Sequence, residues 1–166
     1  MCGVVGAIAQ RNVVPILLEG LRRLEYRGYD SVGVAVVGEQ GLARERSTER
    51  VAELVEQTRR VGLKGLTGIG HTRWATHGAP CERNAHPHFS HGLLSLVHNG
   101  IIENHQPLRE RLAAQGYAFE SDTDTEVMVH LIHSYYVTHH DLLRAVQQTL
   151  AELHGAYAIG VIAADN

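Results

Sequence analysis

The second residue of the chain, Cys2, carries a thiol that could act as a nucleophile. Small second residues usually permit removal of the initiator methionine, which would leave Cys2 with a free α-amine beside its thiol. Ordinary pKa values are roughly 8.5 for a cysteine thiol and about 7.7–8.0 for an α-amine, so proton transfer from sulfur to nitrogen is nearly thermoneutral. One residue would then supply both a nucleophile and its base. Taken by itself, a cysteine at this position is more often an incidental or oxidisable surface thiol.

Three polar segments could complete a site around such a thiol. Residues 71–78 follow an expected strand and combine a guanidinium, an indole, hydroxyls and imidazoles, a set suited to holding a small polar substrate. Asn99 and Gly100 could together provide the two donors that an oxyanion hole requires. Residues 122–126 offer carboxylates near an expected helix start.

Each of these segments also has a plainer structural interpretation. An Asn-Gly pair such as Asn99-Gly100 is more often only a tight turn. The run of Asp and Thr at 122–125 is more often only a helix cap, and Arg73 could pair with any surface acid. Because the structural interpretation is favoured for each segment singly, only their combination argues for a catalytic site.

Composition limits the classes to which the protein can belong. A length of 166 residues suits a single domain, and 44% apolar and 20% charged residues are ordinary globular values. The net charge of −3, with acids and bases interleaved, gives no reason to expect a nucleic-acid partner. No apolar run approaches the roughly 20 residues that span a bilayer, and the start lacks a basic leader, so neither a membrane segment nor a signal peptide is expected. The two cysteines, Cys2 and Cys81, are expected to be reduced in the cytoplasm.

A metal-dependent hydrolase is an alternative, because the chain has 12 histidines. Histidines cluster at 86–91, and His71 and His77 could approach them. No His-Glu-x-x-His motif or Cys/His zinc spacing is present, so no metal is expected and these histidines are expected to shape their loop. The glycine-rich stretch at 65–70 lacks the Gly-Lys-Ser/Thr of a phosphate loop. Neither a nucleotide nor any other cofactor is therefore expected.

Hydrophobic patterns predict the elements that position these segments. Strands are expected where small and β-branched apolar residues run together, at 3–9, 31–37, 42–46, 67–75, 93–98 and 156–164. Helices are expected where apolar residues recur at helical spacing, at 14–24, 49–60, 104–114, from 123 and from 141. The first strand is expected to be buried, the last to be buried on both faces, and residues 77–91 to form a loop. This order predicts a layered α+β fold.

Polar residues mark the expected helix starts. Asn12, Asn104 and Asp141 stand where an N-cap is needed, and Thr123 with Glu126 forms a capping box. The last expected strand would leave an uncovered edge at the end of the chain. The sequence is therefore expected to be a fragment.

Several longer segments also resemble segments of a known protein family. In order, they are Met1-Cys-Gly-Val-Val-Gly6, Leu24-Glu-Tyr-Arg-Gly-Tyr-Asp-Ser31, Gly70-His-Thr-Arg-Trp-Ala-Thr-His-Gly78, Asn84-Ala-His-Pro-His88, His98-Asn-Gly-Ile-Ile-Glu-Asn104 and Ser121-Asp-Thr-Asp-Thr-Glu-Val127. Together they resemble the glutaminase domain of the glutamine–fructose-6-phosphate aminotransferase (glucosamine-6-phosphate synthase) family, within the class II amidotransferases. The resemblance covers essentially the whole chain, and its segments are too long for chance agreement.

The resemblance implies an N-terminal-nucleophile hydrolase fold, in which two antiparallel sheets stack between helical layers. It implies that Cys2 is the nucleophile and that its α-amine is the base. Asn99 and Gly100 would stabilise the tetrahedral oxyanion. Arg73 would bind the α-carboxylate of glutamine, for which a planar guanidinium fork suits better than lysine. Asp124 would bind the α-ammonium.

The resemblance also assigns surrounding residues. Thr76 and His77 would line the glutamine pocket, and Trp74 would help to shield the released ammonia. Arg27 would lie near the nucleophile in a supporting role.

The implied activity is hydrolysis of L-glutamine to glutamate and ammonia through a Cys2 thioester. In the full-length enzyme the ammonia would serve the synthesis of glucosamine 6-phosphate from fructose 6-phosphate. Purine-pathway relatives typically carry His and Gln where Tyr26 and Tyr29 stand, and Tyr where Trp74 stands, so the hexosamine branch fits better. The alternatives left open are the glutaminase domain of another class II amidotransferase and a fragment without turnover.

The resemblance also predicts how this chain relates to the full-length protein. Residues 1–166, or 2–166 after loss of Met1, would be the glutaminase domain without its C-terminal part. The missing partner would be a sugar-phosphate isomerase domain, and the full-length chain would form a homodimer in the cytoplasm.

Overall fold

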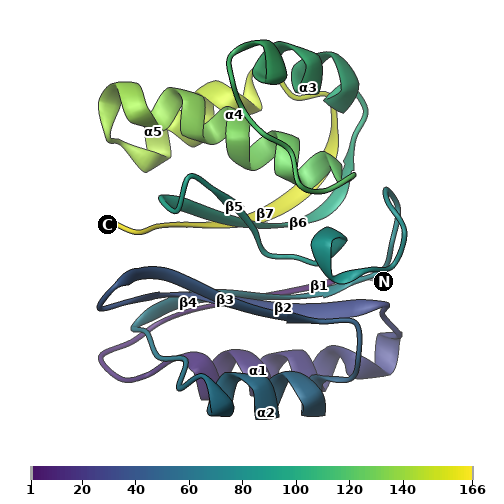
Figure 1. The fold of residues 1–166 in the computed structure, drawn as a ribbon, viewed down its shortest axis with the longest axis vertical. Helices are drawn as coiled ribbons and strands as arrows, with labels where there is room; N and C mark the ends of the chain where they lie inside the picture. Colours follow the sequence, from purple (N-terminus) through teal and green to yellow (C-terminus); the bar gives the residue numbers. More distant parts are fainter. Residues whose placement is uncertain (1, 166) are drawn as a thin grey trace.

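The computed structural model describes residues 2–165, which form two stacked antiparallel sheets (Figure 1). The first sheet has the strand order β1-β4-β2-β3 and the second β5-β6-β7. The strands are β1 (Gly3–Ile8), β2 (Ser31–Gly38), β3 (Gly41–Ser47), β4 (Thr67–Arg73), β5 (His88–Ser90), β6 (Leu94–Ile102) and β7 (Gly155–Ala163). The helices are α1 (Val14–Leu24), α2 (Val51–Arg60), α3 (His105–Ala114), α4 (Asp124–His139) and α5 (Leu142–Leu150), with short 3-10 turns η1 (Glu25–Arg27) and η2 (Glu82–Asn84).

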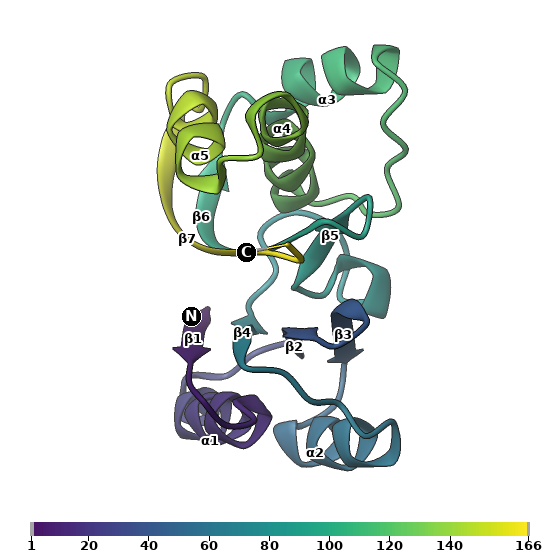
Figure 2. The ribbon, with the colours of Figure 1, turned by 90° about the vertical axis from the view of Figure 1, so that its left-hand side faces the viewer.

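Helices cover the outer face of each sheet. In Figures 1 and 2, α1 and α2 lie beneath the four-stranded sheet, whereas α3, α4 and α5 lie above the three-stranded sheet. A small apolar cluster fills the space between the sheets; its buried members are Ala35, Ile69, Val97 and Ile162. The α+β fold of two antiparallel sheets between helices, predicted from the sequence, is confirmed.

Helix α1 places β4, the strand that leads to Arg73. Its buried face carries Leu17 and Leu21, and burial of such a side chain contributes roughly 1.5–3 kcal/mol. The helix packs closely because the facing residue of β4 is Gly68, where a Cβ atom would lie only 2.8 Å from Leu17 Cδ1. The packing of α1 therefore fixes the strand that ends at the candidate site.

Helix α4 is the buried centre of the other half. The Thr123 hydroxyl accepts the Glu126 N–H at 3.3 Å, as the predicted cap requires. The Glu126 carboxylate, however, accepts the N–H groups of Glu120 and Ser121 at 2.8 and 2.7 Å. The Thr123 cap is confirmed. In a capping box the Glu126 carboxylate would accept the N–H of Thr123, but here it binds the preceding loop.

The burial predicted for the first and last strands was wrong. β1 is an edge strand whose Ile8 side chain is 83% exposed. β7 pairs only with β6, and within this strand only Ile162 and Ala163 are buried. An apolar composition does not separate a central strand from an edge strand, because the neighbouring strand decides the burial.

The loop predicted at 77–91 contains η2 and β5, and β6 continues to Ile102, beyond the predicted end at His98. Of the other predicted caps, Asp141 accepts the Arg144 N–H at 3.0 Å. Asn12 accepts the Val14 N–H at 3.2 Å, but the N-cap of α1 is Val13, so the prediction of Asn12 as the N-cap was wrong. The prediction for Asn104 was wrong, because its side chain bonds outside its own helix, to Glu152 and His154. No helix in the described part of the chain is both long and apolar enough to cross a membrane.

Candidate active site

Cys2 lies at the start of β1, beside the end of β4. The register pairs Gly3 with Thr72, which brings Cys2 next to the segment after Arg73. The Trp74 N–H donates to Cys2 Sγ at 3.1 Å. A Cβ atom on Gly3 would lie 2.5 Å from Leu24 Cδ1, so glycine lets the strand lie this close to α1 without a shift of the Leu24 side chain. The half-buried thiol is thus held by backbone geometry.

Asn99 and Gly100 lie on the opposite sheet, and the interpretation of this pair as a tight turn was wrong. Both residues are within β6, paired with Ala158 and Tyr157 of β7. The Asn99 Nδ2 donates to the carbonyl oxygen of Cys2 at 3.3 Å. Gly100 has φ +138°, and a Cβ atom there would lie 2.0 Å from the Ala156 oxygen. The two sheets therefore bring a thiol and an amide donor together.

A small hollow of about 20 Å³ lies at this meeting point. It contains every predicted site residue except Asn99 and Arg27, and its complete lining is Cys2, Arg73, Trp74, Thr76, His77, His86, His98, Gly100, Thr123, Asp124 and Thr125. Asn99 joins the group through its contact with Cys2. The residue before β1, the end of β4 and the segment after it, β6 and the start of α4 therefore converge on one place.

Arg73 is buried at the edge of this hollow and holds the following segment. Its Nη1 lies 3.3 Å from Asp30 Oδ1, and its Nη2 donates to the carbonyl oxygens of Gly78, at 3.0 Å, and of His77. A guanidinium has more N–H donors than these three contacts use. Arg73 can therefore anchor this segment and still donate to a carboxylate.

Asp124 faces the hollow from the first residue of α4. Its side chain is buried, and Oδ2 accepts the Ile102 N–H at 2.9 Å. His77 Nδ1 lies 3.8 Å from the same oxygen, and His98 Nδ1 lies 4.0 Å from Oδ1. A buried carboxylate with free lone pairs is suited to an ammonium group.

Three histidines near Cys2 are kept neutral by burial. Burial lowers the pKa of His71 to about 4, and it lowers the pKa values of His86 and His98 below the ordinary value. The His71 and His86 rings stack with centroids 4.2 Å apart. The surroundings of Cys2 thus contain polar but uncharged rings.

Asp30 is a site residue that sequence reasoning did not single out. It pairs with Arg73, accepts the N–H of Ala75, and receives the Ser31 hydroxyl at 3.0 Å. Only the strand register, which pairs Ser31 with Arg73, reveals that these residues meet. Arg27 does not line the hollow and lies in η1, with Nε 3.0 Å from the Tyr26 hydroxyl.

Residues 2–165 contain no group of three or more His, Cys, Asp or Glu side chains arranged to hold a metal ion. The 86–91 histidines instead contact one another, neighbouring rings and hydroxyl groups. His86 and His88 pack edge to face at 5.0 Å, and His88 Nε2 lies 3.0 Å from the Thr123 hydroxyl.

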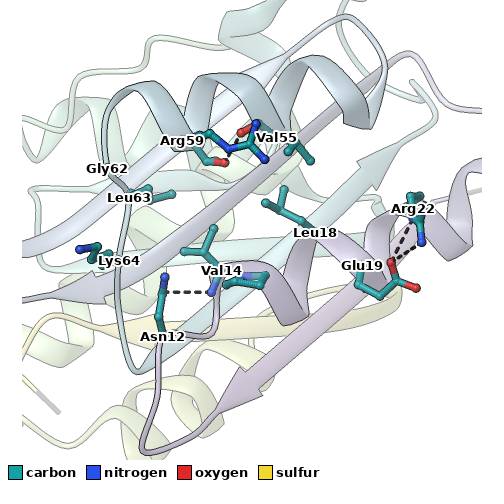
Figure 3. Close-up of a pocket in the computed structure, with 12 residues that line it drawn as sticks. Asn12, Val14, Leu18, Glu19, Arg22, Val55, Arg59, Gly62, Leu63 and Lys64 are labelled. Atoms are coloured by element: carbon teal, nitrogen blue, oxygen red, sulfur yellow. Dashed lines mark hydrogen bonds and ion pairs between the residues drawn. The ribbon is translucent and has the colours of Figure 1, made fainter.

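A larger groove lies far from this chemistry, between α1 and α2. The volume of this groove is about 540 Å³. Figure 3 shows Val14 and Leu18 of α1 and Val55 of α2 among the residues that line it. Arg22 and Arg59 at its rim pair within their own helices, with Glu19 at 2.8 Å and with Glu56 at 2.6 Å. Its lining contains neither a thiol nor a histidine, so the smaller hollow at Cys2 is the candidate active site.

Comparisons with known proteins show which family the chain resembles. Residues 71–166 match the family described as "Glutamine amidotransferase domain". The chain is 58% identical to the glutamine–fructose-6-phosphate aminotransferase (isomerizing) of Legionella pneumophila strain Paris over 163 residues, which are 98% of this chain and 27% of that protein. It is 60% identical to the Pseudomonas aeruginosa enzyme of the same name over 165 residues, again 27% of that protein. The chain thus spans about a quarter of the length of these relatives.

A solved structure shows the same fold. The glutamine phosphoribosylpyrophosphate amidotransferase from B. subtilis, complexed with ADP and GMP, superposes with a TM-score of 0.82 at 28% identity. The superposition covers 99% of this chain and 35% of that one.

Proposed function

Because the chain belongs to the glutamine amidotransferase domain family, we propose that the site around Cys2 hydrolyses L-glutamine to glutamate and ammonia. The observation that carries the proposal is the placement of Asn99 Nδ2 3.3 Å from the Cys2 carbonyl oxygen, with Gly100 lining the same hollow. A thiol with nearby N–H donors is the arrangement that acyl transfer requires.

The first half of the reaction forms a thioester. The α-amine of Cys2 takes the thiol proton, and the sulfur attacks the side-chain amide carbon of glutamine. Asn99 Nδ2 and the Gly100 N–H then donate to the oxyanion. The protonated amine returns its proton to the leaving nitrogen, and ammonia departs as the C–N bond breaks. Water hydrolyses the γ-glutamyl thioester in the second half, releasing glutamate and restoring the thiol.

This scheme requires removal of Met1, a residue that lies outside those described by the structure. While Met1 remains, the Cys2 nitrogen is an amide and has no basic lone pair. The proposal therefore predicts that only chains beginning at Cys2 turn over glutamine.

Substrate recognition is proposed to rest on two buried charges. Arg73 binds the α-carboxylate, Asp124 binds the α-ammonium, and Thr76 and His77 close the pocket. A hollow of about 20 Å³ holds little more than one water molecule, so glutamine enters only if the 74–78 segment moves outward. Trp74 lies on this segment and is 56% exposed, and we propose that it covers the product ammonia once the segment returns.

In the longer protein, we propose that this domain supplies ammonia to a sugar-phosphate isomerase domain that makes glucosamine 6-phosphate. The support is the identity of about 58–60% to aminotransferases of that name, of which the chain covers 27%. A full-length homodimer is part of the same proposal.

The proposed function is tested with a Cys2→Ala variant and a Cys81→Ala control. Intact mass first establishes that Met1 is absent from each preparation. We expect Cys2→Ala to remain folded by circular dichroism and to lose glutamate release, while Cys81→Ala keeps the wild-type rate. Turnover by Cys2→Ala near the wild-type rate would falsify the nucleophile assignment.

A further inference from the structure

His71 lies in β4 and connects the two sheets at the candidate site. Its ring is 1% exposed, and its Nε2 lies 2.7 Å from Asn99 Oδ1 on β6. Its Nδ1 is buried without a hydrogen-bond partner among the described residues. The Nε2 atom of this ring thus faces the side-chain amide proposed to stabilise the oxyanion.

We propose that His71 is a positioning residue, whose Nε2–H donates to Asn99 Oδ1 and holds the Asn99 NH₂ group toward the reacting amide. The inference rests on the proposed function and deepens it, because it explains what orients the oxyanion donor. His71 itself touches neither the thiol nor the hollow.

The contacts on both sides of the amide agree on its orientation. Asn99 Oδ1 can only accept, so the facing Nε2 must carry the ring proton. On the other side, Asn99 Nδ2 donates to the Cys2 carbonyl oxygen at 3.3 Å. Reversing the amide would place two acceptors together at Cys2 and would break the Nε2–H···Oδ1 hydrogen bond to His71. The Cys2 carbonyl oxygen and the Nε2–H of His71 together therefore favour the orientation that presents the NH₂ group to the oxyanion.

The ring itself is prevented from turning away. His71 stacks on His86 with a centroid distance of 4.2 Å and an interplanar angle of 27°. The backbone of His86 packs directly against Gly33 of β2. A Cβ atom on residue 33 would lie only 2.2 Å from the His86 carbonyl oxygen, so glycine at this position leaves the space that His86 occupies. Burial keeps the pKa of His71 at about 4, so the ring stays neutral throughout the pH range in which a thiol and an amine could exchange a proton.

The test compares His71→Leu with His71→Gln in chains that begin at Cys2. Leucine removes the donor, whereas the glutamine side chain can place an N–H near the position of Nε2. We expect His71→Leu to lower kcat by about 10- to 100-fold with little change in KM, less than the about 10²–10³-fold loss on removing an oxyanion donor outright. His71→Gln should recover most of kcat. His133→Leu is the matched control, because His133 is also buried and bonds one hydroxyl, that of Tyr117 at 2.8 Å, outside the site.

A double-mutant cycle with Asn99→Ala separates positioning from a general structural role. In the Asn99→Ala background, His71→Leu should have almost no further effect on kcat, because the group that it positions is gone. Alkylation of Cys2 by iodoacetamide needs no oxyanion donor, so its rate should be the same in wild type and His71→Leu. Equal losses from His71→Leu in both backgrounds, a wild-type kcat in His71→Leu, or slowed alkylation would each overturn the inference. Undiminished glutaminase activity in Cys2→Ala would instead overturn the proposed function.

Discussion

At the scale of single residues, Arg73 has two tasks that lysine cannot combine. Its guanidinium holds Asp30 and the carbonyl oxygens of His77 and Gly78, and it also lines the hollow at Cys2. A lysine ammonium is a compact point charge without the planar fork that binds a carboxylate through two hydrogen bonds. The same side chain therefore shapes the pocket and is proposed to bind the α-carboxylate of the substrate.

We expect Arg73→Lys to raise KM for glutamine by about 10- to 100-fold, since a hydrogen bond to a charged group contributes about 1.5–3 kcal/mol and 1.4 kcal/mol is a factor of ten. Initial rates over a range of glutamine concentrations measure the change. Arg111→Lys, which alters the 2.6 Å ion pair with Glu152 outside the site, is the control and should leave KM unchanged. An unchanged KM in Arg73→Lys would argue against the proposed α-carboxylate contact.

The sequence identified the reactive residue types but not all the residues that organise them. Cys2, Asn99 and Gly100 could be named from their chemistry, because a terminal thiol and an amide beside a glycine suggest a nucleophile and donors. Asp30 and His71 could not, because each is significant only through a partner about 30 to 40 positions away: Arg73 for Asp30 and Asn99 for His71. Strand register, which composition does not reveal, creates these pairs.

At the scale of elements, the Glu126 carboxylate fixes the start of α4 and hence Asp124. Burial alone would raise the pKa of Glu126, but interactions with His130, Ser121 and the preceding amides outweigh burial and lower the pKa to about 2. The folded pKa is thus below the value of about 4.5 expected for the unfolded chain. The ionised carboxylate stabilises the fold above pH 4.5, and this stabilisation is lost as the pH falls toward 2.

We expect Glu126→Gln to lower the free energy of unfolding at pH 7 by about 1–3 kcal/mol, because its NH₂ group would face donor N–H groups. The difference from wild type should shrink as the pH falls from about 5 toward 2, since the wild-type carboxylate becomes protonated. Urea unfolding at several pH values measures both. Glu120→Gln, whose side chain is 79% exposed, should change the free energy by less than about 0.5 kcal/mol. A difference independent of pH would contradict the role of the charge.

Whether a segment is a helix or a strand could be predicted from the spacing of its apolar residues, whereas the place of a strand within its sheet could not. The helix at 14–24 was predicted because its apolar residues recur with a clear period. The hairpin strands were predicted at 31–37 and 42–46, and the structure has them at Ser31–Gly38 and Gly41–Ser47. The burial of β7 was predicted wrongly, because strand order is set by contacts between distant segments. Asn99-Gly100 was read locally as a possible turn, yet the φ of +138° at Gly100 belongs to a strand that lies close to Ala156.

At the scale of the whole molecule, the site exists only where two separately packed halves meet. One apolar core lies between α1, α2 and the first sheet, and another between α3, α4, α5 and the second sheet. The cluster between the sheets is small by comparison. Cys2 and Arg73 come from one half and Asn99 and Asp124 from the other. A change at the junction should therefore affect catalysis before it affects either core.

Gly33→Ala tests this dependence on the junction. The new Cβ atom would lie 2.2 Å from the His86 oxygen, so β2 and the 86–88 segment must separate. Such overpacking typically costs about 1–3 kcal/mol, and Tm should fall by about 2–4 °C per kcal/mol. Because His86 stacks on His71, kcat should fall even at 25 °C, where the protein remains folded. Gly6→Ala is the matched control, since nothing lies within 4 Å of a Cβ atom there, and it should keep both Tm and kcat. If Gly33→Ala lowers Tm but leaves kcat at the wild-type value, the spacing of the two sheets does not control the chemistry at Cys2.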